Sequence, residues 1–223
     1  MDFVNILLIG SPGSGKGTQA RLLINDFDFA YFSAGDILRH LSKENTPLGR
    51  QVLGLIRRGE LVSDLLMKRI LVDFLKKNKG RDILLDGYPR NLSQAKTIDQ
   101  RLILKGGLNL VFYLRISDRE AIRRLSSRVV CCQCGAVYNL ITSPPQKKGI
   151  CDYCGGKLVR RADEKLGAVK KRLLIYKKET KPIVDYFTKK GKLMFIDGER
   201  PIKEIYKEIK KSIDALCLDT KAI

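Results

Sequence analysis

The amino-acid sequence predicts an α/β fold with a parallel sheet, and three observations support this prediction. Short apolar stretches of strand length alternate with longer amphipathic stretches along most of the 223 residues, which is the order typical of βαβ units. A glycine-rich loop follows the first apolar stretch, as expected where a strand of such a sheet passes into a helix. The alternation is interrupted once, by a cysteine-bearing insertion over residues 128–159. One domain with an insertion suits a chain of this length.

The first half of the chain contains three of the expected strands. Residues 3–9 form a short apolar run with β-branched side chains, which predicts the first strand. The glycine-rich loop then opens a helix that we expect from about residue 15 to residue 23. A brief strand near residues 29–32 and a buried strand over residues 82–85 follow. Between these two strands, helical periodicity covers residues 36–41, 48–57 and 63–77.

The second half continues the alternation on both sides of the insertion. Before the insertion we expect a helix over residues 93–104, a strand over residues 109–114 and a helix over residues 118–127. After it, the pattern predicts a long basic helix at about residues 164–189, a strand over residues 193–196 and a final helix over residues 202–216. The five strands are expected to form one parallel sheet flanked by helices.

Composition narrows the class of protein. Hydrophobic residues make up 44% of the chain, enough for a packed core, which excludes a disordered or low-complexity protein. No apolar run approaches the roughly 20 residues needed to cross a bilayer. The first ten residues lack a basic segment and end in a glycine loop, so they do not resemble a secretion signal, and we expect a cytoplasmic protein. A formal net charge of +19 indicates anionic partners without saying which.

The glycine-rich loop over residues 10–18 reads GSPGSGKGT and predicts a phosphate site. Glycines let several backbone N–H groups point at one phosphate, and the N-terminus of the following helix adds its partial positive charge. Lys16 is expected to reach the β- and γ-phosphates of a nucleotide. Gly17 stands where a Mg²⁺-binding hydroxyl is usual, and the hydroxyl follows one place later at Thr18. This departure points away from general ATPases and toward small nucleotide kinases.

A second candidate site follows the buried strand at residues 82–85, where residues 86–90 read DGYPR. Asp86 stands at a strand end beside the phosphate loop and is suited to hold the water shell of Mg²⁺. Gly87 lets a ligand approach the backbone closely. Arg90 can bind a phosphate through two parallel hydrogen bonds. These residues predict the acceptor half of a phosphoryl-transfer site.

Two C-x-x-C pairs predict a metal site in the insertion. Sixteen residues separate the pairs, a spacing that lets two turns wrap four thiolates around one tetrahedral Zn²⁺. The expected ligands are Cys131, Cys134, Cys151 and Cys154. Cys132 lies one residue too close to Cys134 to replace the first ligand, and we expect Cys217 to be an inert thiol. A closed four-thiolate site favours a structural metal over disulfides or unpaired thiols, and it stabilises a segment too short for its own core.

The GKGT loop, the DGYPR segment, the run SAGDILR over residues 33–39 and the cysteine-bearing insertion together resemble the adenylate kinase family. They are most similar to its long bacterial form with a zinc-binding lid, from about residue 5 to residue 216. The resemblance implies the P-loop nucleoside monophosphate kinase fold with two mobile parts, a segment binding the nucleoside monophosphate at residues 33–62 and a zinc-containing lid at residues 128–161. The implied core comprises residues 1–32, 63–127 and 162–223.

The same resemblance implies an activity and its partners. The implied reaction is reversible transfer of a phosphoryl group from MgATP to AMP, giving two ADP, with lid closure excluding water. The implied enzyme is a cytoplasmic monomer whose partners are ATP, AMP and ADP, with Mg²⁺ and a structural Zn²⁺ as cofactors and with neither a membrane nor nucleic acid as a partner. Gln94 would hydrogen-bond the adenine edge of AMP.

The resemblance also implies three sets of site residues. Those around the transferring group are Lys16, Asp86, Arg90, Arg124, Arg128, Arg161 and Arg172. Those for ATP are Gly13, Ser14, Gly15, Lys16, Gly17, Thr18, Arg128, Val137, Tyr138 and the main chain at Arg200. Those for AMP are Ala34, Arg39, Glu60, Leu61, Val62, Gly87, Tyr88, Pro89, Arg90, Gln94, Arg161 and Arg172.

Two alternatives remain at this stage. Ala34 stands where most adenylate kinases have Thr and resembles the UMP/CMP kinases, whereas Gln94 and the long lid favour AMP. Val129 replaces an arginine that often follows Arg128 in the family. The zinc ribbon and the net charge also allow a nucleic-acid-binding protein, but Tyr138 and Tyr153 are the only aromatic residues of the insertion, a small platform for stacking bases.

Overall fold

The computed structural model describes residues 3–102 and 106–219. Its centre is a five-stranded sheet in the order β2-β3-β1-β4-β8, and all four strand pairings are parallel. The strands are β1 (Asn5–Gly10), β2 (Ala30–Ser33), β3 (Ile83–Asp86), β4 (Leu110–Arg115) and β8 (Leu193–Asp197). The predicted α/β class and the predicted parallel sheet are therefore confirmed. The last two residues of the helix expected at residues 93–104 and both ends of the predicted core lie outside the described residues.

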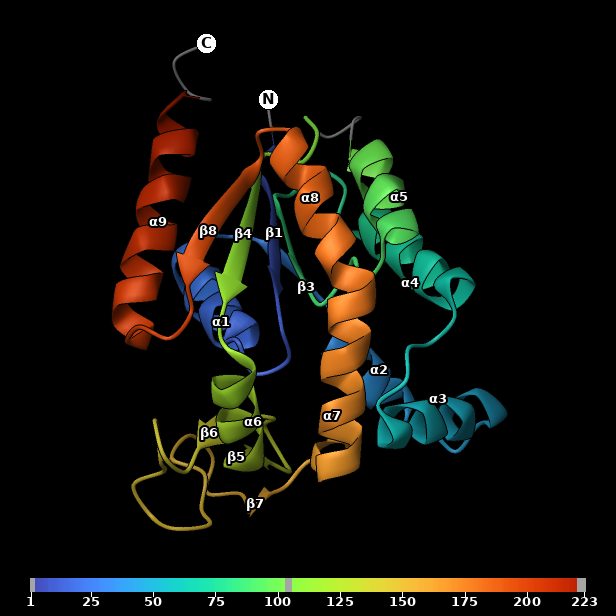
Figure 1. The fold of residues 1–223 in the computed structure, drawn as a ribbon, viewed down its shortest axis with the longest axis vertical. Helices are drawn as coiled ribbons and strands as arrows, with labels where there is room; N and C mark the ends of the chain where they lie inside the picture. The colour runs from blue at the N-terminus through green and yellow to red at the C-terminus, as the bar shows by residue number, and fades with distance from the viewer. Residues whose placement is uncertain (1–2, 103–105, 220–223) are drawn as a thin grey trace.

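Helices cover both faces of the sheet (Figure 1). On one face lie α1 (Lys16–Asp26) and α9 (Ile202–Asp219), and on the other lie α4 (Asp64–Lys77), α5 (Leu92–Leu102) and α8 (Lys181–Lys189). Alternate residues of one strand face opposite layers, so Ile6 and Leu8 of β1 pack against α1 and α9, while Leu7 packs on the opposite side. Two apolar cores therefore hold one rigid sheet between them.

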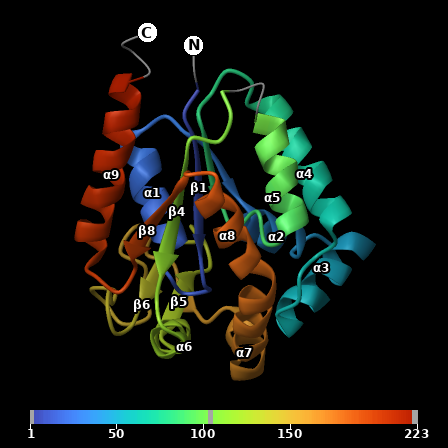
Figure 2. The ribbon, with the colours of Figure 1, turned by 45° about the horizontal axis from the view of Figure 1, so that its top comes forward.

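Two of the remaining helices follow β2 in sequence. Helix α2 (Ala34–Leu41) follows β2 directly, and α3 (Pro47–Arg58) projects beside the carboxyl ends of the strands (Figure 2). The Thr46 side chain accepts a hydrogen bond from the N–H of Gly49 at 2.9 Å and caps α3 at its start. Gly59 ends it in the left-handed conformation at φ 70°, which a glycine adopts without strain.

The long basic helix expected at about residues 164–189 is divided into three parts. It consists of α7 (Leu166–Ile175), a π-helical turn η3 (Tyr176–Thr180) and α8, preceded by a short 3₁₀ turn η2 (Ala162–Glu164). Pro182 lies at the start of α8, where its ring and its missing N–H disfavour a continuous α-helical hydrogen-bond ladder. The predicted helix is confirmed over residues 166–189, with a π-helical turn inside it that the sequence pattern did not predict.

The insertion forms its own small sheet, which the sequence pattern did not predict. Helix α6 (Asp118–Ser126) leads into three antiparallel strands in the order β6-β5-β7, and Figure 1 shows them beyond the carboxyl ends of the large sheet. These strands are β5 (Arg128–Cys131), β6 (Val137–Asn139) and β7 (Leu158–Val159). Strands of two to four residues are too short to show the alternation by which strands are recognised. Within the described residues, no helix combines the length and apolar character that a membrane span requires.

Candidate active site

A cavity of about 1180 Å³ lies at the carboxyl ends of the parallel strands. It is bounded by Ser33 at the end of β2, Asp86 at the end of β3 and Gly10 at the end of β1, and it extends to the insertion and to the segment around α2. Every nucleotide-site residue expected from the resemblance lines it. These residues are Gly13, Ser14, Gly15, Lys16, Gly17, Thr18, Ala34, Arg39, Glu60, Leu61, Val62, Asp86, Gly87, Tyr88, Pro89, Arg90, Gln94, Arg124, Arg128, Val137, Tyr138, Arg161, Arg172 and Arg200.

The phosphate loop is folded around its own lysine. Nζ of Lys16 donates hydrogen bonds to the carbonyl oxygens of Gly10 at 2.7 Å and Ser11 at 2.9 Å, and to Oγ of Ser14 at 3.2 Å. Gly15 immediately precedes α1 and has φ 94°, a left-handed conformation that favours glycine. Burial lowers the pKa of Lys16 to about 8, although the carboxylate of Asp86 opposes this shift. An anion bound in the loop would raise the pKa of this ammonium group again.

Asp86 faces the phosphate loop from the neighbouring strand. Its side chain is 9% exposed and accepts a hydrogen bond from the hydroxyl of Tyr31 at 3.1 Å. Burial raises the pKa of Asp86, while the charge of Lys16 lowers it. A methyl group built on Gly17 would stand 3.4 Å from Oδ2 of Asp86, so the carboxylate lies directly beside the loop. A carboxylate oxygen at this place fits the water shell of a nucleotide-bound Mg²⁺.

The acceptor half is built around Gly87, which has φ 72°. Nε of Arg90 donates to the carbonyl oxygen of Gly87 at 2.9 Å. A methyl group built on Gly87 would lie 3.6 Å from Nη2 of Arg90 and 3.7 Å from Cβ of Ala34. The guanidinium group and the alanine methyl group therefore border the same part of the cavity, where a phosphate and the group attached to it can lie together. Burial lowers the pKa of Arg90, and the charge of Arg172 lowers it further.

Four cavity arginines are held by carboxylates. Arg39 pairs with Asp36 at 2.5 Å and Arg124 with Glu120 at 2.6 Å, each within one helix. Arg172 pairs with Asp163 at 2.9 Å, and Arg128 pairs with Glu164 across 36 residues of sequence. These carboxylates limit the rotamers of the guanidinium groups, so the positive charges are oriented before a ligand arrives.

Arg161 differs from these four arginines. Its Nε atom is buried and has no hydrogen-bond partner among the described residues. Burial lowers the pKa of Arg161, and the neighbouring charges of Arg128 and Arg39 act in the same direction. A buried cation among other cations is costly unless an anion joins it. The cavity therefore offers an arginine N–H without a partner, to which a phosphate oxygen can bind.

The segment that links α3 to α4 is also fixed by charge. The carboxylate of Glu60 accepts from Nε of Arg58 at 3.0 Å and from Nζ of Lys171 on α7 at 2.6 Å. Its hydrogen bond with Arg58, followed by that with Lys171, lowers the pKa of Glu60 to about 2. Arg200 also lines the cavity and pairs with Glu208 on α9.

The carboxylates that hold the arginines were missed by sequence reasoning. Asp36 and Glu120 precede their arginines by three and four residues on one helix, and this spacing could have identified them. Asp163 and Glu164 are brought to Arg172 and Arg128 by the turn η2. No local pattern marks those two partners, because their pairing depends on how the insertion returns to the core.

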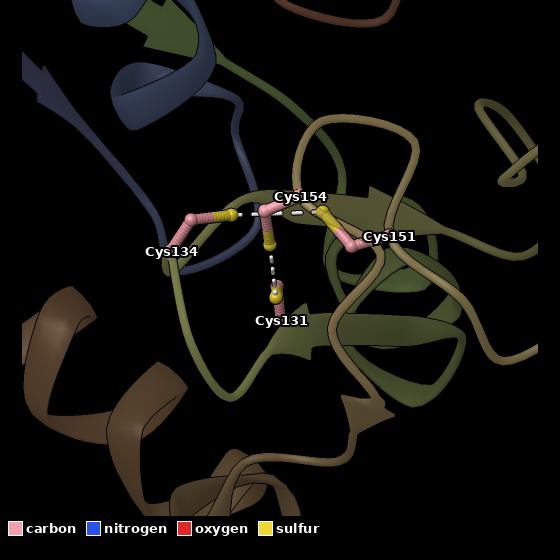
Figure 3. A group of neighbouring side chains, drawn as sticks. All are labelled: Cys131, Cys134, Cys151 and Cys154. Carbon is pink, nitrogen blue, oxygen red and sulfur yellow. Dashed lines mark hydrogen bonds between the residues drawn. The ribbon is translucent and has the colours of Figure 1, made fainter.

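The four predicted zinc ligands converge within the insertion (Figure 3). Their Sγ atoms all lie within 4.8 Å of one another, and the pairs Cys131–Cys154 and Cys134–Cys151 are 3.4 Å and 3.5 Å apart. Bonded sulfurs lie about 2.05 Å apart, so these pairs are not disulfides. A Zn–S bond of about 2.3 Å in a tetrahedral site separates sulfurs by about 3.8 Å. The donor set fits a structural Zn²⁺.

The surroundings of the cysteines support the same assignment. Gly135 and Gly155 follow the two C-x-x-C pairs with φ 71° and 70°, and their N–H groups donate to the carbonyl oxygens of Cys131 and Cys151. A methyl group built on Gly156 would stand 2.8 Å from Sγ of Cys131. Cys132 is exposed and lies outside the cluster, as expected, and Cys217 packs against the core on the side of α9.

Comparison with known proteins agrees with this geometry. The family model described as "Adenylate kinase" matches residues 8–192. A relative from Caldanaerobacter subterraneus subsp. tengcongensis, named adenylate kinase, is 43% identical over 212 residues, covering 94% of this chain and 96% of the relative.

Relatives with the same name from Methanosarcina barkeri and Petrotoga mobilis are 42% and 40% identical. They cover 93% and 92% of this chain, and 97% and 95% of their own lengths. None of these findings favours the UMP/CMP kinase alternative. The chain therefore belongs to the adenylate kinase family.

Proposed function

We propose that this protein catalyses the reversible transfer of a phosphoryl group from MgATP to AMP, producing two ADP. The observation that carries the proposal is the single cavity that joins the phosphate loop to the acceptor segment and is lined by arginines from both sides. Arg161 has a buried, unpartnered Nε there, which suits a cavity built for more than one polyanion.

The proposed chemistry consists of positioning and charge neutralisation. Phosphoryl transfer needs aligned donor and acceptor oxygens and little covalent help from the protein. Lys16 and the loop amides would bind the β- and γ-phosphates of ATP, and Arg90 and Arg39 would bind the phosphate of AMP. Arg124, Arg128, Arg161 and Arg172 would stabilise the charge on the transferring group. The acceptor is itself an anion, so no general base is required.

Two metal ions belong to the proposal, with different tasks. Mg²⁺ bound with ATP supplies charge neutralisation on the phosphates, and Asp86 would hold its water shell. Zn²⁺ on the four cysteines would have no open coordination position and would only stabilise the insertion.

The proposed domain division has two mobile parts, a lid at residues 128–161 and an AMP-binding segment at residues 33–62. Lid closure would bring Arg128 and Arg161 onto ATP and exclude water.

The test is an ADP-production assay with MgATP and AMP, CMP or UMP as acceptor, beside a blank without acceptor. We expect activity with AMP far above that with CMP or UMP, and a blank near zero. A preference for CMP or UMP would show that Ala34, and not Gln94, indicates the acceptor that the enzyme uses, and it would overturn the AMP assignment. Absence of activity with all three acceptors would contradict the proposal as a whole.

The proposed enzyme is a cytoplasmic monomer that works on free ATP, AMP and ADP. Sedimentation analysis tests whether the protein is a monomer in solution. Nucleic acid is not a proposed partner, and a titration with labelled RNA at physiological salt tests this point, because binding through basic residues depends steeply on salt.

A further inference from the structure

A hydrogen-bonded group of three side chains lies behind the acceptor half of the cavity. Nε2 of Gln94 donates to Oδ1 of Asp64 at 2.7 Å. Nδ2 of Asn91 donates to both oxygens of Asp64, at 3.0 and 3.1 Å, and Oδ1 of Asn91 accepts from the backbone N–H of Gln94 at 2.9 Å. Of the three, Gln94 lines the cavity and is 4% exposed, whereas Asp64 stands outside at the start of α4.

These bonds determine which way the Gln94 amide faces. A carboxylate only accepts hydrogen bonds, so Nε2 and not Oε1 must face Asp64. Oε1 accepts the backbone N–H of Arg90 at 2.8 Å. A reversed amide would set two acceptors against each other at Asp64 and two donors against each other at Arg90. The observed orientation leaves one N–H on Nε2 and one lone pair on Oε1 for a ligand.

The orientation of such an amide selects between purine bases. Adenine presents an amino donor beside a ring-nitrogen acceptor, which a glutamine amide matches with its C=O and N–H. Hypoxanthine has a keto oxygen in place of the amino group and an N–H in place of the neighbouring ring acceptor. Its pattern is the reverse of adenine's, so it matches a reversed amide. A fixed amide therefore distinguishes AMP from IMP, and a freely rotating amide does so less well.

We propose that Asp64 is a positioning residue for acceptor specificity, which holds the Gln94 amide in the orientation that matches adenine and rejects 6-oxopurines. Asp64 acts through Gln94 and is not itself part of the cavity wall. The inference rests on the proposed function, because it takes a nucleoside monophosphate as the acceptor.

The test compares kcat and KM for AMP and for IMP in the wild type, in Asp64→Asn and in Asp64→Ala. An asparagine at this place can donate or accept, so it no longer specifies the orientation of Gln94. We expect the ratio of kcat/KM for AMP to kcat/KM for IMP to fall about tenfold in Asp64→Asn, the size expected for one hydrogen bond to a charged group. The change should appear mainly in KM, since the phosphate-binding arginines are untouched. Asp64→Glu keeps the carboxylate and should restore most of the discrimination.

The matched control is Asp118→Asn, which also removes a carboxylate from the first turn of a helix, α6, but this carboxylate pairs with Lys177 and not with Gln94. It should leave the AMP-to-IMP ratio unchanged. An unchanged ratio in folded Asp64→Asn and Asp64→Ala, or an equal change in Asp118→Asn, overturns the inference. A wild type without activity toward AMP would overturn the proposed function instead, so the two failures are distinguishable. Asp64→Ala provides the same test if Asp64→Asn does not fold.

Discussion

Nη2 of Arg21, on the first core helix, donates a hydrogen bond to the carbonyl oxygen of Gly135 in the cysteine-bearing insertion at 2.8 Å. The two residues are 114 positions apart in sequence. Gly135 directly follows Cys134, one of the predicted zinc ligands, so this bond links α1 to the predicted metal site.

Replacing Arg21 should loosen this link without disturbing the core. We expect Arg21→Ala to speed amide hydrogen exchange in residues 128–161 by up to about tenfold, because one exposed hydrogen bond contributes about 1 kcal/mol. Hydrogen-exchange mass spectrometry of the protein without nucleotide checks this. Arg101→Ala, on α5, is the control and should leave exchange in the insertion unchanged. Equal exchange in Arg21→Ala and the wild type would show that the bond does not restrain the insertion.

ATP binding should take up a proton at alkaline pH. The pKa of Lys16 is lowered to about 8 by burial, and a bound phosphate raises it again. Above about pH 8 the free protein has a largely neutral Lys16 and the complex a charged one, so the affinity for ATP should fall as the pH rises through this value. Calorimetry at about pH 8.5 in buffers of different ionisation enthalpy measures the uptake. A Lys16→Arg variant should bind without uptake, and buffer-independent enthalpies in the wild type would refute the prediction.

Removal of the metal should unfold the insertion and abolish transfer. We expect the purified protein to contain a single zinc ion, and a chelator to lower both Tm and activity, because four thiolates without their metal leave this small sheet with little core of its own. Metal analysis and thermal unfolding measure this. Cys134→Ser should reproduce the effect of the chelator, whereas Cys132→Ser, its exposed neighbour outside the cluster, should retain zinc and activity.

Loss of the Asp163 carboxylate should destabilise the protein. Asp163 is 5% exposed and pairs with the half-buried Arg172, so Asp163→Asn leaves this guanidinium without its carboxylate partner. We expect the free energy of unfolding at neutral pH to fall by about 3 kcal/mol. Urea unfolding measures it. The exposed pair of Asp118 and Lys177 is the control, and Asp118→Asn should change stability by less than about 1 kcal/mol.

The Asp163 carboxylate should also make the free energy of unfolding depend on pH. Burial alone would raise the pKa of Asp163, but the charges of Arg172, Arg161 and others outweigh it and the pKa lies below its ordinary value. A lowered folded pKa means that the stabilisation is complete at neutral pH and is lost as the pH falls below about 4. The difference between wild type and Asp163→Asn should therefore shrink in acid. A constant difference down to about pH 3 would contradict this assignment.

Local patterns were sufficient to predict most of the fold and a set of site residues that the structure brings to one cavity. The phosphate loop, the DGYPR segment and the paired cysteines each carry their chemistry within a few consecutive residues, so their roles are visible before folding. The strand order is not local, but a parallel alternation of strands and helices permits few arrangements. The five parallel strands were predictable for that reason.

The rest of the site depends on contacts between distant segments. Glu164 reaches Arg128 across 36 residues and Asp64 reaches Gln94 across 30, and neither pair has a repeating pattern. The strands of the insertion have only two to four residues, too few to show the alternation by which a strand is recognised. The π-helical turn is likewise not marked by a local pattern, because it depends on α7 facing the cavity with Arg172 while α8 faces the sheet with Ile183 and Phe187.

The π-helical turn η3 rotates the side chains of α8 about the helix axis relative to those of α7. A π-helical turn contains about one residue more than an α-helical turn, so it rotates α8 relative to α7 by about 100°. Arg172 before the turn faces the cavity, and Ile183 and Phe187 after it face the sheet. Deleting one residue within Tyr176–Thr180 would make the segment a regular α-helix and turn either Arg172 away from the cavity or Ile183 and Phe187 away from the sheet. A substitution that keeps the number of residues would not. The orientation of α7 relative to α8 therefore depends on the number of residues in this turn more than on their identity.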